Sequence, residues 1–422
     1  MKVRGRLTRT DVAVGLGMLS PHLVAAFARH GATVSAVLAA SARRFGDDVA
    51  VVDVQGDLSY RELDGLVSAV ASGLQQRERI GVVCTSTRWL LVAIAAVSRA
   101  GADAVLINPK TGATELDGIV ARERITRLLC DDDVAARADA PATRPARGGR
   151  IVLLSSGTTG VPVSTSRAPL RLPQLATALS LIAAAGFRRG EPVLVLAPLH
   201  HGHGVSVAMA CLAIGAPVLL GRELLPRASV VSGVPAQLVW LADELDAGTH
   251  VRRVISGSAR MPIALARRLA AHTELVNFFG TTQTGTLTVS RTSETVGRPV
   301  AGVTIEIIDG VVFATSPLGS GPTGDRGRLD QTGQLTLTGR TDALIDSGGE
   351  NISPSEVEHL LLAHPEVSDA QVRAVADERL GHVLAALVVT TLSADAVRQL
   401  VARELSPGKV PRAVEIVERI AR

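Results

Sequence analysis

Glycine and hydroxyl-bearing residues cluster directly after the apolar run IVLL at 151–154. The cluster reads Ser155-Ser156-Gly157-Thr158-Thr159-Gly160. Its flexible backbone and its hydroxyl groups can surround a phosphate group with N–H and O–H donors. It is not the Walker pattern, because no Gly-Lys-Ser/Thr closes it. Taken alone, the cluster leaves two alternatives open, a phosphate-binding loop and an ordinary polar turn.

Three histidines follow another apolar run. His200, His201 and His203 come directly after PVLVLAPL at 192–199. Three imidazoles can ligate zinc. No acidic residue or cysteine lies nearby in the sequence, so we expect the histidines to line a pocket rather than to bind a metal.

Four more polar, glycine-containing segments follow downstream. They are Asn277-Phe278-Phe279-Gly280-Thr281-Thr282-Gln283, Thr323-Gly324-Asp325, Gly339-Arg340-Thr341-Asp342 and Ser347-Gly348-Gly349-Glu350-Asn351-Ile352. A carboxylate in such a segment suits a vicinal diol, because its two oxygens accept both O–H donors. Each segment alone also has the composition of a simple turn. It is their order and spacing that indicate a function.

In this order and spacing the motifs resemble those of the adenylate-forming (AMP-binding) superfamily, which includes acyl-CoA synthetases, nonribosomal adenylation domains and luciferases. The resemblance runs from about residue 33 to the end of the chain and is closest to acyl-CoA synthetases. It implies a large N-terminal domain, a small mobile C-terminal domain, and an active site between them. The implied chemistry is a ligase reaction in which a carboxylate and ATP give acyl-AMP and pyrophosphate. Transfer of the acyl group to the thiol of CoA often follows.

The resemblance assigns the nucleotide site. It implies that Ser155 to Gly160 hold the ATP phosphates, that Thr282 contacts the α-phosphate, and that Gln283 supports Mg²⁺. It also implies that Asp325 and Arg340 bind the ribose hydroxyls. The structural alternative is that Thr282 and Gln283 bond only the local backbone and that Asp325 is an ordinary turn residue.

The resemblance also assigns the acid and thiol sites. His201 corresponds to the histidine beside the acyl pocket, and Asp342 falls at the hinge of the small domain. Gly348 and Gly349 would line the pantetheine tunnel, where missing side chains let a ligand approach the backbone.

Three positions depart from the family pattern, and the family pattern has a charged residue at all three. Val163 stands where the glycine-rich loop normally carries a lysine, and Gln283 replaces a Mg²⁺-linked glutamate. The late Pro-x-Gly-Lys motif would follow Arg422, where the sequence stops. Removing one preorganised charged or hydrogen-bonding group from an active site lowers kcat by about 10²–10³.

Two basic residues are candidates to replace the missing cations. Lys409, in Pro407-Gly408-Lys409, is our candidate catalytic lysine, and a surface lysine is the structural alternative. Arg167 lies just downstream of the phosphate loop and could supply a cation where Val163 does not.

Our leading hypothesis is therefore an AMP-forming acyl-CoA synthetase that uses ATP, Mg²⁺ and a CoA or carrier-protein thiol, and that activates a small or medium organic acid. One alternative keeps the fold but activates an unusual oxyacid, such as nitrite with an aryl amine for diazo formation. Another is a non-catalytic relative that binds a nucleotide or acyl ligand. A sequence truncated before its last motif would also explain the missing lysine.

Composition excludes several other classes. The chain has 422 residues, nine aromatic side chains and no dense Lys/Arg block, so we expect no nucleic-acid partner. Three dispersed cysteines without a CxxC pair favour a reducing cytoplasm. The longest apolar stretch, Val205–Leu220, is interrupted by Gly215 and Pro217, so we expect no membrane span. The N-terminal residues resemble an amphipathic leader more than a signal peptide.

The elements that would position these motifs alternate along the chain. Short apolar runs alternate with helical patterns from about residue 50, which predicts parallel sheets covered by helices. One helix begins with Ser59 and Glu62 in capping-box spacing. Residues 131–149 lack periodicity and predict a loop, in which Asp131–Asp133 would be a solvated strand end rather than a metal site.

The last third changes character. Short alternating runs at 297–340 predict antiparallel strands, and 341–422 has a small α/β pattern of its own. We therefore predict an α/β fold, α+β overall, with a large N-terminal adenylation domain at 1–340 and a small mobile α/β domain at 341–422. The large domain would combine helix-flanked sheets with a small β-rich subdomain.

Overall fold

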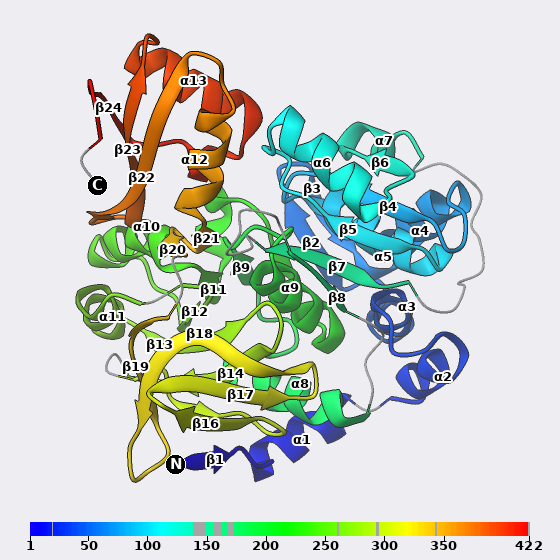
Figure 1. The fold of residues 1–422 in the computed structure, drawn as a ribbon. Helices are drawn as coiled ribbons and strands as arrows, with labels where there is room; N and C mark the ends of the chain where they lie inside the picture. Colours follow the sequence, from blue (N-terminus) through cyan, green and yellow to red (C-terminus); the bar gives the residue numbers. More distant parts are fainter. Residues whose placement is uncertain are drawn as a thin grey trace.

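The computed structural model describes residues 1–18, 20–137, 149–155, 163–167, 172–259, 261–292, 295–341 and 344–420. Figure 1 shows a large body built from three sheets and a smaller unit at the C-terminal end, orange to red. No helix in these ranges is long and apolar enough to cross a membrane.

The largest sheet has nine strands in the order β15-β14-β13-β12-β11-β9-β10-β2-β3. The six strands from β13 to β2 pair in parallel, and the edge strands are antiparallel. The strands are β2 (Val49–Asp53), β3 (Gly56–Ser59), β9 (Val193–Val195), β10 (Val218–Leu219), β11 (Val230–Gly233), β12 (Arg253–Ser256), β13 (Glu274–Thr281), β14 (Gly285–Ser290) and β15 (Arg298–Pro299). Its central strands are short and almost wholly buried, as parallel strands covered on both faces must be.

The second sheet has the order β6-β4-β5-β7-β8, with β8 antiparallel to β7. Its strands are β4 (Arg79–Val82), β5 (Asp103–Leu106), β6 (Arg127–Leu129), β7 (Ile151–Ser155) and β8 (Val163–Arg167). Helix α5 (Arg88–Ala100) lies between this sheet and the largest one and is buried on all sides. That position explains why most of its residues are apolar and why its two buried arginines, Arg88 and Arg99, are paired with Asp53 and Asp64.

Helices cover both sheets, as the sequence predicts in general, although it did not predict the helix at 172–185. The capping box of Ser59 and Glu62 forms at the start of its helix, which confirms that prediction. The covering helices are α3 (Val34–Phe45), α4 (Tyr60–Ser72), α6 (Ala113–Glu123), α8 (Leu172–Ala185), α9 (Gly202–Ile214), α10 (Pro235–Asp246) and α11 (Ile263–Ala270), with the 3₁₀ helix η1 at Arg222–Arg227.

The prediction of a loop over 131–149 is wrong at its start. Residues Asp131–Ala135 form the short helix α7, because Asp133 accepts the backbone N–H of Cys130. Asp131 accepts hydrogen bonds from the Thr85 N–H and hydroxyl and from the Thr87 hydroxyl. The aspartate run therefore begins a helix and joins it to the loop before α5.

The third sheet is antiparallel in the order β1-β16-β17-β18-β19, which confirms the prediction for 297–340. Its strands are β1 (Lys2–Arg4), β16 (Thr304–Ile308), β17 (Val311–Ser316), β18 (Gly319–Leu329) and β19 (Leu335–Arg340). The N-terminal strand β1 therefore pairs with a strand three hundred residues later, at Lys2 and Glu306. Sequence patterning did not predict this pairing.

Two N-terminal helices follow β1, where we expected an amphipathic leader. They are α1 (Arg9–Met18) and α2 (Pro21–His30). Helix α1 packs on α8, where Gly15 leaves room for the Leu179 side chain, and α2 packs on α3. Both helices are thus part of the folded body.

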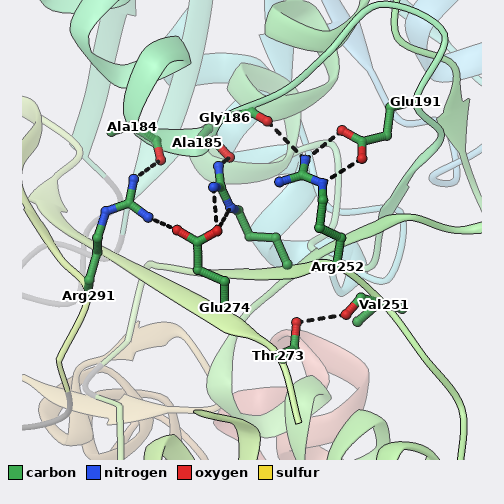
Figure 2. Close-up of polar contacts among 10 residues, drawn as sticks. Ala184, Ala185, Gly186, Glu191, Val251, Arg252, Thr273, Glu274 and Arg291 are labelled. Atoms are coloured by element: carbon green, nitrogen blue, oxygen red, sulfur yellow. Dashed lines mark hydrogen bonds and ion pairs between the residues drawn. The ribbon is translucent and has the colours of Figure 1, made fainter. Parts of the chain in front are cut away.

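Arginine side chains fix the C-terminal end of α8 to the largest sheet (Figure 2). Arg291 donates to the carbonyl of Ala184, Arg253 to that of Ala185, and Arg252 to that of Gly186. Glu274 and Glu191 balance these cations. Cations at the last carbonyls of a helix satisfy free acceptors and interact favourably with the helix dipole. This anchor holds α8 in place along the cavity described below.

The C-terminal unit is a small sheet in the order β21-β20-β23-β22, with β24 beside β23. Its elements are β20 (Ile345–Ser347), β21 (Glu350–Ile352), α12 (Pro354–Leu362), β22 (Val367–Asp377), β23 (Gly381–Thr390), α13 (Ala394–Glu404), η2 (Pro407–Lys409) and β24 (Ala413–Ile416). The boundary that we place between residues 340 and 341 stays a prediction.

Candidate functional site

The polar motifs follow the carboxyl ends of neighbouring parallel strands. His200 and His201 follow β9, Val234 follows β11, Gly257 follows β12, and Thr282 follows β13. Because these strands are parallel and adjacent, their carboxyl ends meet at one edge of the sheet. That edge is where open α/β sheets bind ligands.

A cavity of about 1970 Å³ opens at this edge. Its walls come from the large body and from the small C-terminal unit. Among the residues chosen from the sequence, it is lined by His200, His201, His203, Arg167, Thr282, Gln283, Asp325, Gly348, Gly349 and Lys409. The structure therefore brings together motifs that lie up to 242 residues apart in the sequence (167 to 409).

The turn after β13 presents hydroxyl groups to the cavity. Thr281 and Thr284 hold the turn, because their hydroxyls lie 2.7 Å apart and the Thr284 N–H donates to the Thr281 Oγ1 at 3.1 Å. Thr282 and Gln283 stand at its tip and line the cavity. The Asn277 Oδ1 is buried and has no hydrogen-bond partner among the described residues, and Asn277 lines the same cavity. A buried acceptor without a partner favours a ligand that donates to it.

Asp325 lies on β18, opposite Arg340 of β19. It is only 7% exposed, and its backbone N–H donates to the Thr323 Oγ1 at 3.2 Å. Asp325 is therefore a buried acidic residue in the wall of the cavity.

Arg167, the last residue of β8, connects this strand to the turn after β13. Its guanidinium donates to the backbone carbonyls of Thr282 and Gln283, the latter at 3.4 Å. Burial lowers the pKa of Arg167 from its usual value. No carboxylate pairs with it among the described residues. The structure thus places a cation beside the turn, although the sequence lacks the lysine at position 163.

The histidines differ in environment. His203 donates to or accepts from the Ser232 hydroxyl at 3.0 Å, and burial lowers its pKa to about 4. Both ring nitrogens of His200 are buried without a partner in the described part of the chain. Burial, reinforced by His201, lowers the pKa of His200 to about 3. Both rings are therefore neutral at neutral pH.

His201 meets the small unit across the cavity. Its Nε2 lies 3.5 Å from the Glu350 Oε1. Burial raises the pKa of Glu350, but His201, His200 and Lys409 outweigh that effect, so its pKa lies below the usual value. Glu350 is therefore ionised at neutral pH.

The glycines before Glu350 allow close packing. Gly348 and Gly349 have φ of +62° and +96°, which side chains rarely adopt. A Cβ on Gly349 would lie 3.0 Å from Val234 of the large body. Gly348 and Gly349 therefore form a tight turn, which was the structural alternative, and they also line the cavity.

Lys409 is not at the surface, contrary to the structural alternative. It is 5% exposed, and its Nζ lies 2.6 Å from the Glu115 Oε1 and 2.8 Å from the Glu356 Oε1. Burial lowers its pKa, but the two carboxylates outweigh burial and raise it. In this arrangement the carboxylates of Glu115 and Glu356 balance the charge of Lys409. The catalytic role of Lys409 stays a prediction.

Several predicted positions lie outside the described residues. They are Ser156, Gly157, Thr158, Thr159, Gly160 and Asp342. Ser155 is the last residue of β7, and the backbone of Arg340 ends β19. The roles assigned to these residues stay predictions.

Sequence reasoning missed Glu115 and Glu356. Glu115 belongs to α6 and Glu356 to α12, and neither stands in a polar motif that suggested a site. Asn277 was quoted within its motif without a role. Its position at the end of an apolar run, four residues before Thr281, was the available signal.

Comparison with known proteins assigns the fold to a family. A family model described as "AMP-binding enzyme" matches residues 38–155 and 149–320, and a second, "AMP-binding enzyme C-terminal domain", matches 356–422. The chain belongs to the AMP-binding enzyme family. The resemblance stated from the motifs is confirmed, and so is an AMP-forming ligase as the class of enzyme.

Characterised relatives cover most of the chain. It is 29% identical to 2-succinylbenzoate–CoA ligase of Salmonella typhimurium, over 83% of this chain and 84% of the relative. It is 26% identical to a 3-[(3aS,4S,7aS)-7a-methyl-1,5-dioxo-octahydro-1H-inden-4-yl]propanoyl:CoA ligase of Rhodococcus jostii, over 92% and 96%. The solved structure of o-succinylbenzoate CoA synthetase from Bacillus subtilis superposes with a TM-score of 0.80 at 20% identity, over 92% and 95%. The predicted fold, with a large N-terminal and a smaller C-terminal domain, is confirmed.

Proposed function

We propose that this protein is an ATP-dependent ligase that adenylates a carboxylic acid and passes the acyl group to the thiol of CoA. The proposal rests on one observation, which is that Thr282, Asp325 and Gly349 line the same cavity. Relatives that are CoA ligases support CoA as the acceptor.

The residues present suit a nucleotide. The turn at Thr281–Thr284 offers hydroxyl groups, Asp325 offers a buried carboxylate, and Asn277 offers an unpartnered acceptor. A carboxylate accepts both hydroxyls of a ribose, and an amide oxygen accepts a donor from a base. ATP would supply the phosphoryl anhydride whose cleavage drives the activation.

The protein offers few ligands for Mg²⁺. In the described part of the chain, no three histidine, cysteine or acidic residues converge in a way that could hold a metal. Mg²⁺ in such sites is often bound through one or two protein ligands and the substrate phosphates. The amide oxygen of Gln283, exposed at the tip of its turn, is the ligand that we propose.

The chain's own groups then orient the reaction. Arg167 fixes the backbone carbonyls of Thr282 and Gln283, which would hold the turn that presents Thr282 to the phosphate. Its positive charge, which no carboxylate within the described ranges balances, would stabilise negative charge that develops beside the turn. His201 of the large body and Glu350 of the small unit face each other across the cavity, so both would lie beside the acyl group during its transfer.

The thiol would approach along the glycine turn. Gly348 and Gly349 carry no side chain at the point where the small domain packs near Val234 and Ala236 of the large body. We therefore propose this turn as the wall of the pantetheine channel.

The three cysteines are free, which supports the reducing cytoplasm as the place of the reaction.

Exchange of labelled pyrophosphate into ATP tests the adenylation step. We expect exchange that requires both Mg²⁺ and a carboxylic acid, followed by CoA-dependent release of AMP. Absence of exchange with every acid, together with calorimetric binding of ATP, would establish a non-catalytic relative instead. Nitrogen loss or azo coupling with nitrite and an aryl amine would establish the oxyacid alternative.

A further inference from the structure

One side of helix α9 leads away from the polar end of the cavity. After His203, the residues of α9 that line the cavity are Val205, Ser206, Val207, Met209, Ala210 and Ala213. Ser206, Ala210 and Ala213 are spaced by four and three residues, so they share one face of the helix. Ala210 and Ala213 leave space because their side chains are small.

Helix α8 forms a second apolar wall. It reads LPQLATALSLIAAA and contains no charged residue. Ala178, Ile182 and Ala185 line the cavity with helical spacing. A helix that is apolar on all sides is normally buried on all sides. Here most described side chains of α8 are only half-buried, and part of their apolar surface is the wall of the cavity.

Helices α2 and α3 complete this part of the cavity. Leu23, Val24 and Phe27 of α2 line it, and so do Val34 and Val37 of α3. Helix α2 precedes residue 38, where the match to the family model begins. This wall therefore comes from a segment that the family model does not include. We call the part of the cavity lined by α2, α3, α8 and α9 the apolar arm.

The apolar arm carries no charge at neutral pH. None of the described cavity-lining residues of these four helices is Asp, Glu, Lys or Arg. His203 is their titratable residue, and burial keeps it neutral because it lowers the pKa to about 4. Away from the exposed Val24, a second carboxylate or an ammonium group in the arm would lose its water without gaining a partner.

We propose that the acid has an extended, apolar aliphatic or alicyclic body that lies in the apolar arm, with its carboxylate between Thr282 and His201. This inference rests on the proposed function and adds the substrate class to it. From Leu175 to Ala185, α8 extends for about 15 Å at 1.5 Å per residue. Such a length suits a medium- or long-chain acid better than acetate or a short dicarboxylate.

The first test is a series of straight-chain acids from acetate to tetradecanoate, compared by pyrophosphate exchange. Burial of each methylene group should raise kcat/KM by about fourfold until the arm is filled. Succinate and glutarate should be activated far less than hexanoate. A kcat/KM that stays flat or falls with chain length, while exchange with a short acid persists, would overturn the apolar arm and leave the proposed function standing.

Substitutions in the arm make the test specific. Ala210→Phe on α9 and Ala178→Phe on α8 would fill the space. If either excludes four methylene groups, the ratio of kcat/KM for dodecanoate over butyrate should fall by roughly 200-fold. Ala176→Phe is the matched control, because Ala176 lies on α8 but does not line the cavity. It should keep the wild-type ratio. An unchanged ratio in both arm variants would contradict the proposal.

A binding measurement separates this inference from the enzymatic activity. The fluorescent polyene acid cis-parinaric acid should bind wild-type protein without ATP, be displaced by dodecanoate, and bind at least tenfold more weakly to Ala210→Phe. This result without any pyrophosphate exchange would refute the proposed function and support the apolar arm. Failure of cis-parinaric acid and dodecanoate to bind wild-type protein would refute the arm.

Discussion

The Lys409 Nζ lies 2.6 Å from the Glu115 Oε1, and this ion pair joins the small C-terminal domain to helix α6 of the large domain. Glu356 of α12 binds the same ammonium from within the small domain, at 2.8 Å. The Glu115 Oε2 also accepts the backbone N–H of Ser406 at 3.1 Å. Glu115 therefore connects the two domains through both of its carboxylate oxygens.

The two carboxylates of this cluster should differ in their contribution to stability. Glu115→Gln weakens a buried ion pair across the interface, and we expect a loss of about 3 kcal/mol in the free energy of unfolding. Glu356→Gln should lose less, because burial already raises the pKa of Glu356 and its Oε2 has no partner among the described residues. Urea unfolding of both variants measures the difference. An equal or larger loss in Glu356→Gln would contradict the prediction.

Arg167 should act on the chemical step rather than on folding alone. We expect Arg167→Met to lower kcat for pyrophosphate exchange by about 10²-fold, because it removes a preorganised cation and frees the turn that carries Thr282. Arg167→Lys should recover part of the rate. Arg150→Met, an exposed arginine just before β7, is the matched control and should behave like the wild type. Retained ATP binding and full activity in Arg167→Ala would exclude the role.

Local signals in the sequence predicted much of the site. The capping box at Ser59 and the turn at Thr281–Thr284 depend on residues three apart, so their chemistry is visible in the sequence. The parallel pairing of β9, β11, β12 and β13 then follows from short apolar runs between helices. That pairing is sufficient to bring His201 and Thr282 to one edge.

Long-range partners could not be predicted in this way. Glu115 and Lys409 are 294 residues apart, and only the packing of the two domains brings them together. Helix α8 was not predicted, because it lacks the alternation of polar and apolar faces that reveals a surface helix. Helix α7 was missed because its cap is Cys130, an unusual residue at that position.

Restoring the family's negative charge at position 283 should increase the rate of pyrophosphate exchange. Gln283→Glu adds a carboxylate at the exposed tip of the turn, where we propose that Mg²⁺ is held. We expect the Mg²⁺ concentration for half-maximal exchange to fall and kcat to rise by about tenfold, since carboxylates are the preferred protein ligands of Mg²⁺. Exchange measured across a Mg²⁺ titration tests this. Gln76→Glu, at an exposed position between α4 and β4 that does not line the cavity, is the control for added negative charge.

Buried histidine should make the protein sensitive to acid. The pKa of His203 is lowered to about 4 by burial, whereas an unfolded histidine has its usual value of 6.5. Between these two values the unfolded chain binds the proton and the folded protein does not, so stability falls as the pH falls from 6.5 toward 4. The loss should be roughly 3 kcal/mol for this residue.

His203→Gln can keep a hydrogen bond to Ser232 but cannot be protonated, so it should lose less stability over this range. Unfolding curves of both proteins at pH 7, 5.5 and 4.5 measure the effect, and parallel losses would show that His203 does not cause it.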